Sequence, residues 1–181
     1  MTVEAAPETV RGLMRAGITH VVGIPDNTSG PLFHETARHA AIRLITVARE
    51  GEAFAIACGL WMGGASPLVV VQNTGLLEAG DSLRGTALRM AAPLPLLVTG
   101  RGYEKMSRSG LDAGHDVSLE ALTRGDVDSA ALLTEPTLTA WGVPYSICGE
   151  HDDPVAAIEE LVARAQESER PTALVLTRAL P

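Results

Sequence analysis

Short apolar runs alternate along the chain with longer segments in which apolar residues recur every three or four positions. The runs are apolar at successive positions, which is typical of strands covered on both faces of a parallel sheet. The segments between them carry the periodicity of amphipathic helices. The pattern predicts strands at 19–24, 42–48, 67–72, 94–100, 144–148 and 172–180, and helices at 8–17, 30–40, 49–61, 76–91, within 117–141 and at 153–168.

Repeated alternation of strand and helix predicts an α/β fold, with a doubly wound, mainly parallel sheet and helices on both faces. No repeat, low-complexity stretch or linker divides the sequence, so residues 1–181 are expected to form a single domain. In such sheets the functional loops lie beyond the carboxyl ends of the strands. The polar residues gather in four such segments, which we expect to converge at one edge: 25–30, 49–52, 72–80 and 100–116.

Composition removes several classes of function. The net charge is −8 and no block of Lys or Arg occurs, which argues against a nucleic-acid partner. No apolar run approaches the roughly 20 residues of a membrane span, and the acidic N-terminus does not resemble a signal peptide. Cys58 and Cys148 are isolated in sequence, as in a reduced cytoplasmic protein. We therefore expect a cytoplasmic domain without membrane or nucleic-acid contacts.

Common motifs of catalysis and metal binding are missing. The sequence contains no GxGxxG after the first strand, no GxxxxGK[ST] and no GxSxG. The five histidines show no close ligand spacing, so no metal site is expected within the chain. His115 differs from the others because it lies in the long 100–116 segment, between Asp112 and Asp116. It is therefore a candidate catalytic residue.

The segment "REGEAFAIACGLW" (49–61) places two acids at the start of a helix that is otherwise made of small apolar residues. Glu50 and Glu52 in the first turn could simply complement the helix dipole, which is worth about 0.3–1 kcal/mol. A chemical role for one of the two acids is the alternative. The local pattern alone leaves both interpretations open.

Three segments in order, "GIPDNTSG", "REGEAFAIACG" and "VVVQNTGLLEAGDSL", resemble the pyrimidine-binding domain of thiamine-diphosphate-dependent decarboxylases, above all the phosphonopyruvate and sulfopyruvate decarboxylases. The resemblance runs over essentially the whole chain and implies the fold of that domain. It also implies that Glu50, nine residues before Gly59, hydrogen-bonds N1′ of the cofactor's aminopyrimidine. That contact favours the imino tautomer, whose nitrogen removes the C2 proton and so prepares the attack on a 2-oxo acid. Glu52 does not fit the spacing.

The resemblance implies roles for further residues. The loop Gln72, Asn73, Thr74 and Gly75 would lie against the pyrimidine, with glycine admitting the ring and amides supplying hydrogen bonds. Pro25 and Asp26 would face the substrate, although an Asx-turn is the structural alternative for Asp26. His115 would lie near the substrate.

Three cations follow the predicted fourth strand. Arg101, Lys105 and Arg108 could bind an anionic tail, such as the sulfonate or phosphonate of a C3 acid, or could be solvated loop charges.

The family also holds the cofactor's diphosphate and Mg²⁺ with a second domain that carries GDG and a downstream Asn. This sequence contains no GDG. The resemblance therefore implies the α subunit of a split 2-oxo acid decarboxylase, with a β subunit that grips the diphosphate and Mg²⁺. A carboligase subunit and a non-catalytic α/β binding or regulatory domain are the alternatives.

We expect the chain to assemble as a homodimer or a larger hetero-oligomer. Such assembly requires apolar faces that point outward on two helices; the alternative is that these faces are buried within the domain's own core. The faces consist of Ala53, Ala57 and Leu60 on the first helix and of Leu76, Leu83, Ala87 and Met90 on the second.

Overall fold

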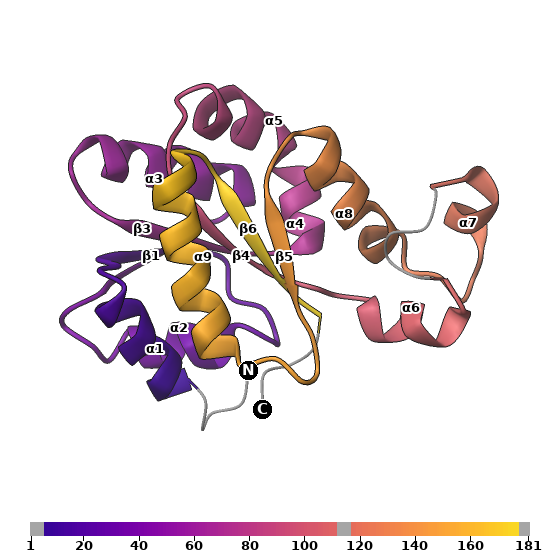
Figure 1. Ribbon diagram of the computed structural model, residues 1–181, viewed down its shortest axis with the longest axis horizontal. Helices are drawn as coiled ribbons and strands as arrows, with labels where there is room; N and C mark the ends of the chain where they lie inside the picture. Colours follow the sequence, from indigo (N-terminus) through magenta and orange to yellow (C-terminus); the bar gives the residue numbers. More distant parts are fainter. Residues whose placement is uncertain (1–5, 112–116, 178–181) are drawn as a thin grey trace.

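The computed structural model describes residues 6–111 and 117–177. Six strands form one sheet in the order β2-β1-β3-β4-β6-β5, and every neighbouring pair is parallel (Figure 1). Because all strands point the same way, their carboxyl ends meet at one edge of the sheet. The strands are β1 (His20–Gly23), β2 (Arg43–Thr46), β3 (Pro67–Gln72), β4 (Pro95–Thr99), β5 (Tyr145–Cys148) and β6 (Thr172–Leu176).

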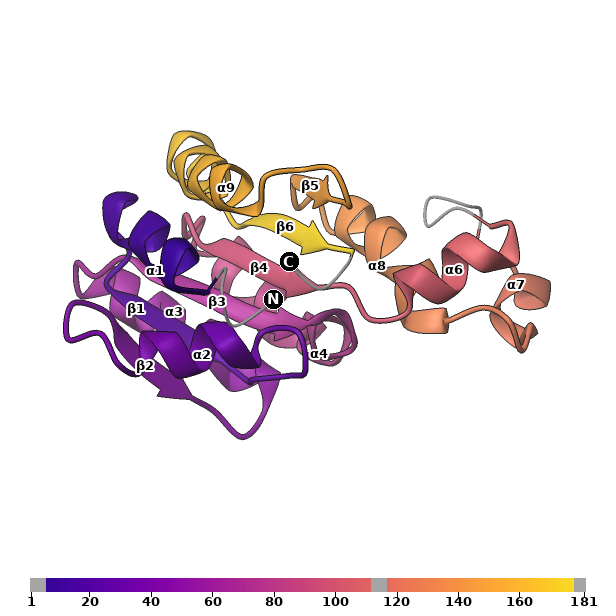
Figure 2. The same cartoon turned by 90° about the horizontal axis from the view of Figure 1, so that it is seen from below.

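Helices cover both faces of this sheet (Figures 1 and 2). Successive residues of a strand point to opposite faces, so Leu68 and Val70 belong to one apolar core while Val69 and Val71 belong to the other. One face carries α1 (Ala6–Arg15), α2 (Gly30–Thr36) and α9 (Pro154–Ser168); the other carries α3 (Glu50–Met62), α4 (Asn73–Glu78), α5 (Gly80–Ser82), η1 (Leu83–Leu88) and α8 (Ser129–Ala140). The predicted α/β architecture is confirmed.

Local side-chain caps fix where the two long C-terminal helices begin. Asp128 accepts hydrogen bonds from the backbone amides at the start of α8, and Asp153 does the same for α9. Such caps satisfy amides that have no partner within the helix and are worth about 1 kcal/mol each. Two shorter helices, α6 (Tyr103–Ser109) and α7 (Leu119–Thr123), lie beyond α8 and away from the sheet (Figures 1 and 2).

Three predicted boundaries are wrong. Residues 72–80 are not a loop, because α4 begins at Asn73, directly after β3. The helix predicted over 76–91 is an interrupted run of α4, α5 and a final π-helical turn, η1. Residues 103–109 of the predicted polar loop form α6. At Asn73 and Tyr103 the first residue of each short helix is held by hydrogen bonds to residues far along the chain, which the local pattern does not contain.

The helix faces expected to meet a partner are instead buried in the chain's own core. Ala53 and Ala57 of α3 are fully buried, as are Leu76, Leu83 and Ala87. Leu60 and Met90 pack against the same core. The alternative stated for these faces is therefore the correct one, because α3 and η1 cover the sheet with the sides that carry these residues. The outer side of α3 is nevertheless apolar: Ala55, Ile56, Gly59 and Met62 are exposed.

Within the residues that the structure describes, no helix is long and apolar enough to cross a membrane.

Candidate active site

The carboxylate of Asp26 joins the loop after β1 to the ends of β3 and β4. Its Oδ1 accepts hydrogen bonds from the amides of Thr28 (2.8 Å) and Ser29 (2.6 Å) and from the Ser29 hydroxyl (2.9 Å). Its Oδ2 accepts from Gln72 Nε2 (3.3 Å) and from the hydroxyl of Thr99. The Asx-turn alternative is therefore present, but the same carboxylate also reaches two neighbouring strands.

Gln72 carries this connection further along the chain. Its Oε1 accepts a hydrogen bond from Thr74 Oγ1 at 2.7 Å, while its Nε2 donates to Asp26. We call Asp26, Ser29, Gln72, Thr74 and Thr99 the Asp26 network. Through it the segments 25–30 and 72–75 meet at the sheet edge, as predicted.

Asn73 is completely buried, and its side chain is used within the chain. Its Nδ2 donates to the carbonyl of Arg101 (3.0 Å) and to Thr134 Oγ1 (3.2 Å), and its Oδ1 accepts from the amides of Thr74 and Arg101, both at 3.1 Å. Both amide donors are occupied. Asn73 therefore holds the loop after β4 against β3 and α8 and has no free donor for a ligand.

Glu50 lies directly over Gly75. A Cβ atom added to Gly75 would stand 2.6 Å from Glu50 Cδ and still closer to its Cγ and Oε1. The space that a side chain would fill is thus taken by the glutamate, whereas the family resemblance implies that this glycine admits the cofactor ring. Glu50 is half-buried, and its carboxylate has no hydrogen bond or salt bridge to any described residue.

Glu52, two residues later, has a structural task. Its Oε2 accepts hydrogen bonds from the amides of Ala48 (3.0 Å) and Arg49 (3.2 Å), which closes the N-terminus of α3. Arg49 also bridges to Glu78 at the end of α4, at 2.6 Å. The dipole and capping interpretation therefore fits Glu52, whereas Glu50 is left available for chemistry.

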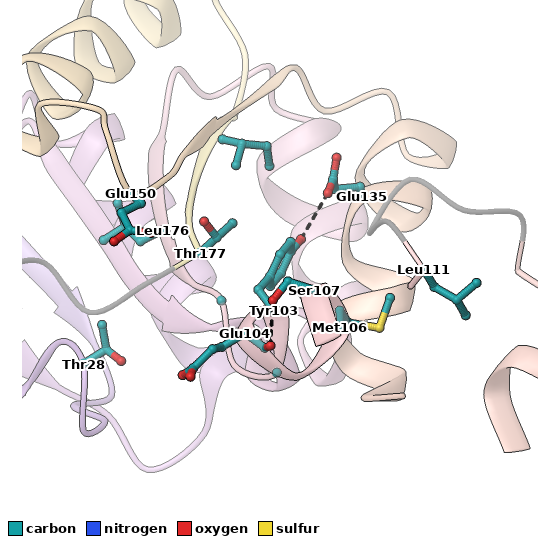
Figure 3. A pocket seen from close by; sticks show the side chains of 13 residues that line it. Thr28, Tyr103, Glu104, Met106, Ser107, Leu111, Glu135, Glu150, Leu176 and Thr177 are labelled. Atoms are coloured by element: carbon teal, nitrogen blue, oxygen red, sulfur yellow. Dashed lines mark hydrogen bonds between the residues drawn. The ribbon is translucent and has the colours of Figure 1, made fainter. Parts of the chain in front are cut away.

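A cavity of about 790 Å³ opens at the carboxyl ends of β4, β5 and β6 (Figure 3). Thr28 contributes from the loop after β1, and its backbone amide donates to Asp26, so the cavity lies one residue contact away from the Asp26 network. Part of the cavity wall is apolar and consists of Tyr103, Met106 and Leu176. Three carboxylates also line the cavity: Glu104, Glu135 and Glu150. The described lining residues include no Lys, Arg or His.

Glu135 holds two tyrosine hydroxyls at this cavity. Tyr103 donates to its Oε1 at 3.4 Å, as Figure 3 shows, and Tyr145 donates to its Oε2 at 3.3 Å. Burial raises the pKa of Tyr103 above its ordinary value, and the nearby Glu135 carboxylate raises it further. Tyr103 is therefore a neutral hydrogen-bond donor, and the three side chains fix α6 and β5 to α8.

The three cations expected to bind an anionic tail do not line the cavity. Arg108 forms an exposed ion pair with Glu104, and Lys105 donates to the Val127 carbonyl at 3.4 Å. Arg101 is exposed.

Two predicted site residues remain, Pro25 and His115. Pro25 is exposed next to Asp26, whereas His115 lies outside the described residues. The structure therefore gathers Glu50, Asp26 and the segment 72–75, and it joins the backbone of Arg101 to Asn73. Arg108 instead pairs with Glu104 on α6.

Residues 4–119, more than half of the chain, match the family model described as thiamine pyrophosphate enzyme, N-terminal TPP binding domain. The chain belongs to this family. The expected resemblance is confirmed, since thiamine pyrophosphate and thiamine diphosphate are one cofactor. Glu50, Asp26 and the segment 72–75 all fall within the matched residues.

Two relatives each match a little more than half of this chain. A phosphonopyruvate decarboxylase from Streptomyces viridochromogenes is 35% identical over 97 residues, which are 54% of this chain and 24% of that protein. The sulfopyruvate decarboxylase subunit alpha from Methanothermobacter thermautotrophicus is 28% identical over 104 residues, which are 58% of this chain and 63% of that subunit. The chain thus spans about a quarter of the length of the first relative and under two thirds of the second.

Solved structures establish the fold. The benzoylformate decarboxylase from Polynucleobacter necessarius superposes with a TM-score of 0.63 at 21% identity, over 94% of this chain and 29% of that one. A putative thiamin diphosphate-dependent enzyme from Mycobacterium smegmatis gives 0.62 at 22% identity, over 97% and 30%.

Sequence reasoning missed several residues at this site. Thr99 ends an otherwise apolar strand, and that single polar residue was a signal for a role at the sheet edge. Thr134 and Glu135 lie mid-helix in α8, where no sequence signal pointed to them. Among the described residues no group of three or more His, Cys, Asp or Glu is arranged to hold a metal ion.

Proposed function

We propose that this chain is the α subunit of a split thiamine-diphosphate-dependent 2-oxo acid decarboxylase and supplies the glutamate that activates the cofactor. The observation that carries the proposal is Glu50: a half-buried carboxylate at the start of an apolar helix, over Gly75, with no hydrogen bond or ion pair to a described residue. A structural carboxylate would be bonded, as Glu52 is. The family match and the names of the two relatives support the same conclusion.

The residues present fit the aminopyrimidine end of the cofactor. When bound, thiamine diphosphate supplies the carbon that attacks the 2-oxo acid and takes up the electrons released with CO₂. Glu50 would face ring atom N1′ and hold or return a proton there, which is general acid–base work by a positioned carboxyl group. Asn73 keeps its neighbours in place through its four hydrogen bonds rather than by touching the ring.

Replacing Glu50 by Gln tests this role, and Glu52→Gln is the matched control two residues along the same helix. Both variants remove one charge from the first turn of α3. We expect Glu50→Gln to lower kcat of the assembled enzyme by about 10²–10⁴-fold, the usual contribution of a general acid–base group, with unchanged thermal stability. Exchange of the cofactor's C2 proton in the loaded enzyme should slow in parallel.

Glu52→Gln should give the opposite result. Its kcat should stay near that of the wild type, while its unfolding free energy falls by about 0.5–2 kcal/mol because a helix cap is weakened. Equal activity of the Glu50→Gln variant and the wild type would exclude the proposed role. Loss of activity in both variants, with equal loss of stability, would reduce Glu50 to a structural residue.

The substrate we propose is a small 2-oxo acid, with sulfopyruvate or phosphonopyruvate favoured by the names of the relatives. The described part of the cavity wall carries carboxylates and no cation. We therefore assign the cation for an anionic tail to the partner subunit, and not to Arg101 or Arg108. His115 stays a proposed substrate neighbour.

We propose a β subunit as the partner, which binds the diphosphate and Mg²⁺. The relative named subunit alpha supports a divided enzyme. The surface we assign to assembly is the outer side of α3, where Ile56 is 36% and Met62 71% exposed. This face replaces the buried faces expected from the sequence. Its position on the helix that begins with Glu50 would place the partner next to the cofactor.

A further inference from the structure

Asp26 is held entirely by groups of its own chain. Five donors from the loop after β1, from the end of β3 and from the end of β4 converge on its two oxygens. We propose that Asp26 is a positioning residue, which sets the orientation of Gln72 and through it the support of Glu50, rather than a contact to the substrate. This inference rests on the proposed function of Glu50.

The carboxylate has no acceptor capacity left for a ligand. An ionised carboxylate offers about four lone-pair positions, and those of Asp26 already serve two backbone amides, two hydroxyls and one side-chain amide. The Ser29 hydroxyl that donates to Oδ1 also accepts from the amide of Asp26 at 3.0 Å. Both the side chain and the backbone of this residue are therefore fixed, and a substrate would have to displace existing bonds to reach it.

Asp26 decides which way the amide of Gln72 points. Oδ2 is an acceptor, so Nε2 must face it, because the reverse orientation would oppose two acceptors. Gln72 Oε1 is then directed at Thr74 Oγ1, 2.7 Å away. Thr74 immediately precedes Gly75, over which Glu50 lies. The orientation set at Asp26 is thus transmitted through two hydrogen bonds to Thr74, the neighbour in sequence of the glycine over which Glu50 lies.

Thr99 extends the same control to a third strand. Its hydroxyl donates to Asp26 Oδ2, and β4 pairs with β3, which pairs with β1. One carboxylate therefore joins the ends of three adjacent strands. Its removal would take two amide hydrogen bonds from the loop that carries Thr28, at the border of the cavity, and would release the side chain of Gln72 from the same loop.

Exchanging the hydrogen-bond acceptor at position 26 and the donor at position 72 tests the proposal. In Asp26→Asn, an amide donor replaces Oδ2, so Gln72 must either oppose it with its own donor or turn its amide over and lose its orientation toward Thr74. In Gln72→Glu, two carboxylates would face each other. In the double variant, which combines Asp26→Asn with Gln72→Glu, the introduced amide donates to the introduced carboxylate. Thr74 can still donate to residue 72, and the Thr99 hydroxyl can accept from residue 26 instead of donating to it.

We expect each single variant to lower kcat of the assembled enzyme by about 10²-fold with KM unchanged, the usual effect of a displacement of about 1 Å at a catalytic group. The double variant should recover to within about tenfold of the wild type, since coupled residues deviate strongly from additivity. A rise in KM for the 2-oxo acid in Asp26→Asn, or no recovery in the double variant, would instead show that the aspartate itself meets the substrate.

Hydrogen exchange of the Thr28 and Ser29 backbone amides provides a measurement that does not depend on activity. We expect faster exchange in both single variants and recovery in the double variant. Exchange that is unchanged in Asp26→Asn overturns the proposal, as does a double variant that fails to fold. If the wild-type complex decarboxylates no 2-oxo acid, the proposed function fails while the exchange result still decides the role of Asp26.

Discussion

Replacement of Gly75 by Ala probes the contact between Gly75 and Glu50 by adding a single methyl group. Gly75 lies in α4 with ordinary helical backbone angles, so alanine is compatible with the backbone. The new Cβ would stand 2.6 Å from Glu50 Cδ, whereas ordinary contacts begin at 3.4 Å. The atoms that must give way belong to the end of a flexible side chain. The fold can therefore accept the change, but Glu50 cannot keep its position.

The structure also sets the size of the effect. The carboxyl group has to move by about 1 Å, a displacement that costs about 10²-fold in rate at a catalytic group. That factor corresponds to about 2.7 kcal/mol in the activation free energy. Stability should change in the other direction, because Gly→Ala within a helix contributes up to about 1 kcal/mol. A slower but equally stable or more stable enzyme is therefore expected.

The assay compares kcat and the midpoint of urea unfolding for Gly75→Ala and for a matched control, Gly85→Ala. Gly85 is also helical and exposed, and an added Cβ would meet nothing within 4 Å. The control should keep full activity. Wild-type kcat in Gly75→Ala would refute the reasoning, because it would mean that the position of Glu50 over Gly75 does not matter for turnover.

Two further outcomes follow from exposure and burial. Met62→Asp should leave the fold intact, since the side chain is 71% exposed, but should reduce the assembly measured by light scattering. Met14→Asp on α1, where the side chain is 40% exposed, is the control. Equal assembly of both variants would exclude the outer side of α3 as the contact. The pKa of Tyr103 is raised in the folded chain by burial, so its contribution to stability is complete below the ordinary value of about 10 and is lost as the pH rises above it. The unfolding free energy of the wild type, measured with denaturant, should therefore fall more steeply above about pH 10 than that of Tyr103→Phe. Equal slopes for the two proteins would contradict this.

The family could be read from the sequence, and Glu50 could be proposed as its acid, because the signals for both are local. Glu50 stands in register with Gly59, and the segments around Asp26 and Gln72 follow predicted strands. The strands themselves were predictable because buried parallel strands are continuously apolar, as 67–72 is. Boundaries failed where short helices replaced a loop, at Asn73 and at Tyr103, since each is stabilised by contacts to distant residues.

By itself the sequence determined the α/β class and the family resemblance, and its spacing led us to propose Glu50 rather than Glu52. Only the tertiary structure decided which groups are occupied. Asn73 and Asp26 are polar residues in a rim segment by sequence, yet the fold surrounds both with partners from three parts of the chain. The inner faces of α3 and η1 proved to be buried for the same reason, because the residues that cover them lie elsewhere in the chain. Hydrogen bonding and burial depend on residues far apart in sequence, and a linear pattern does not contain those distances.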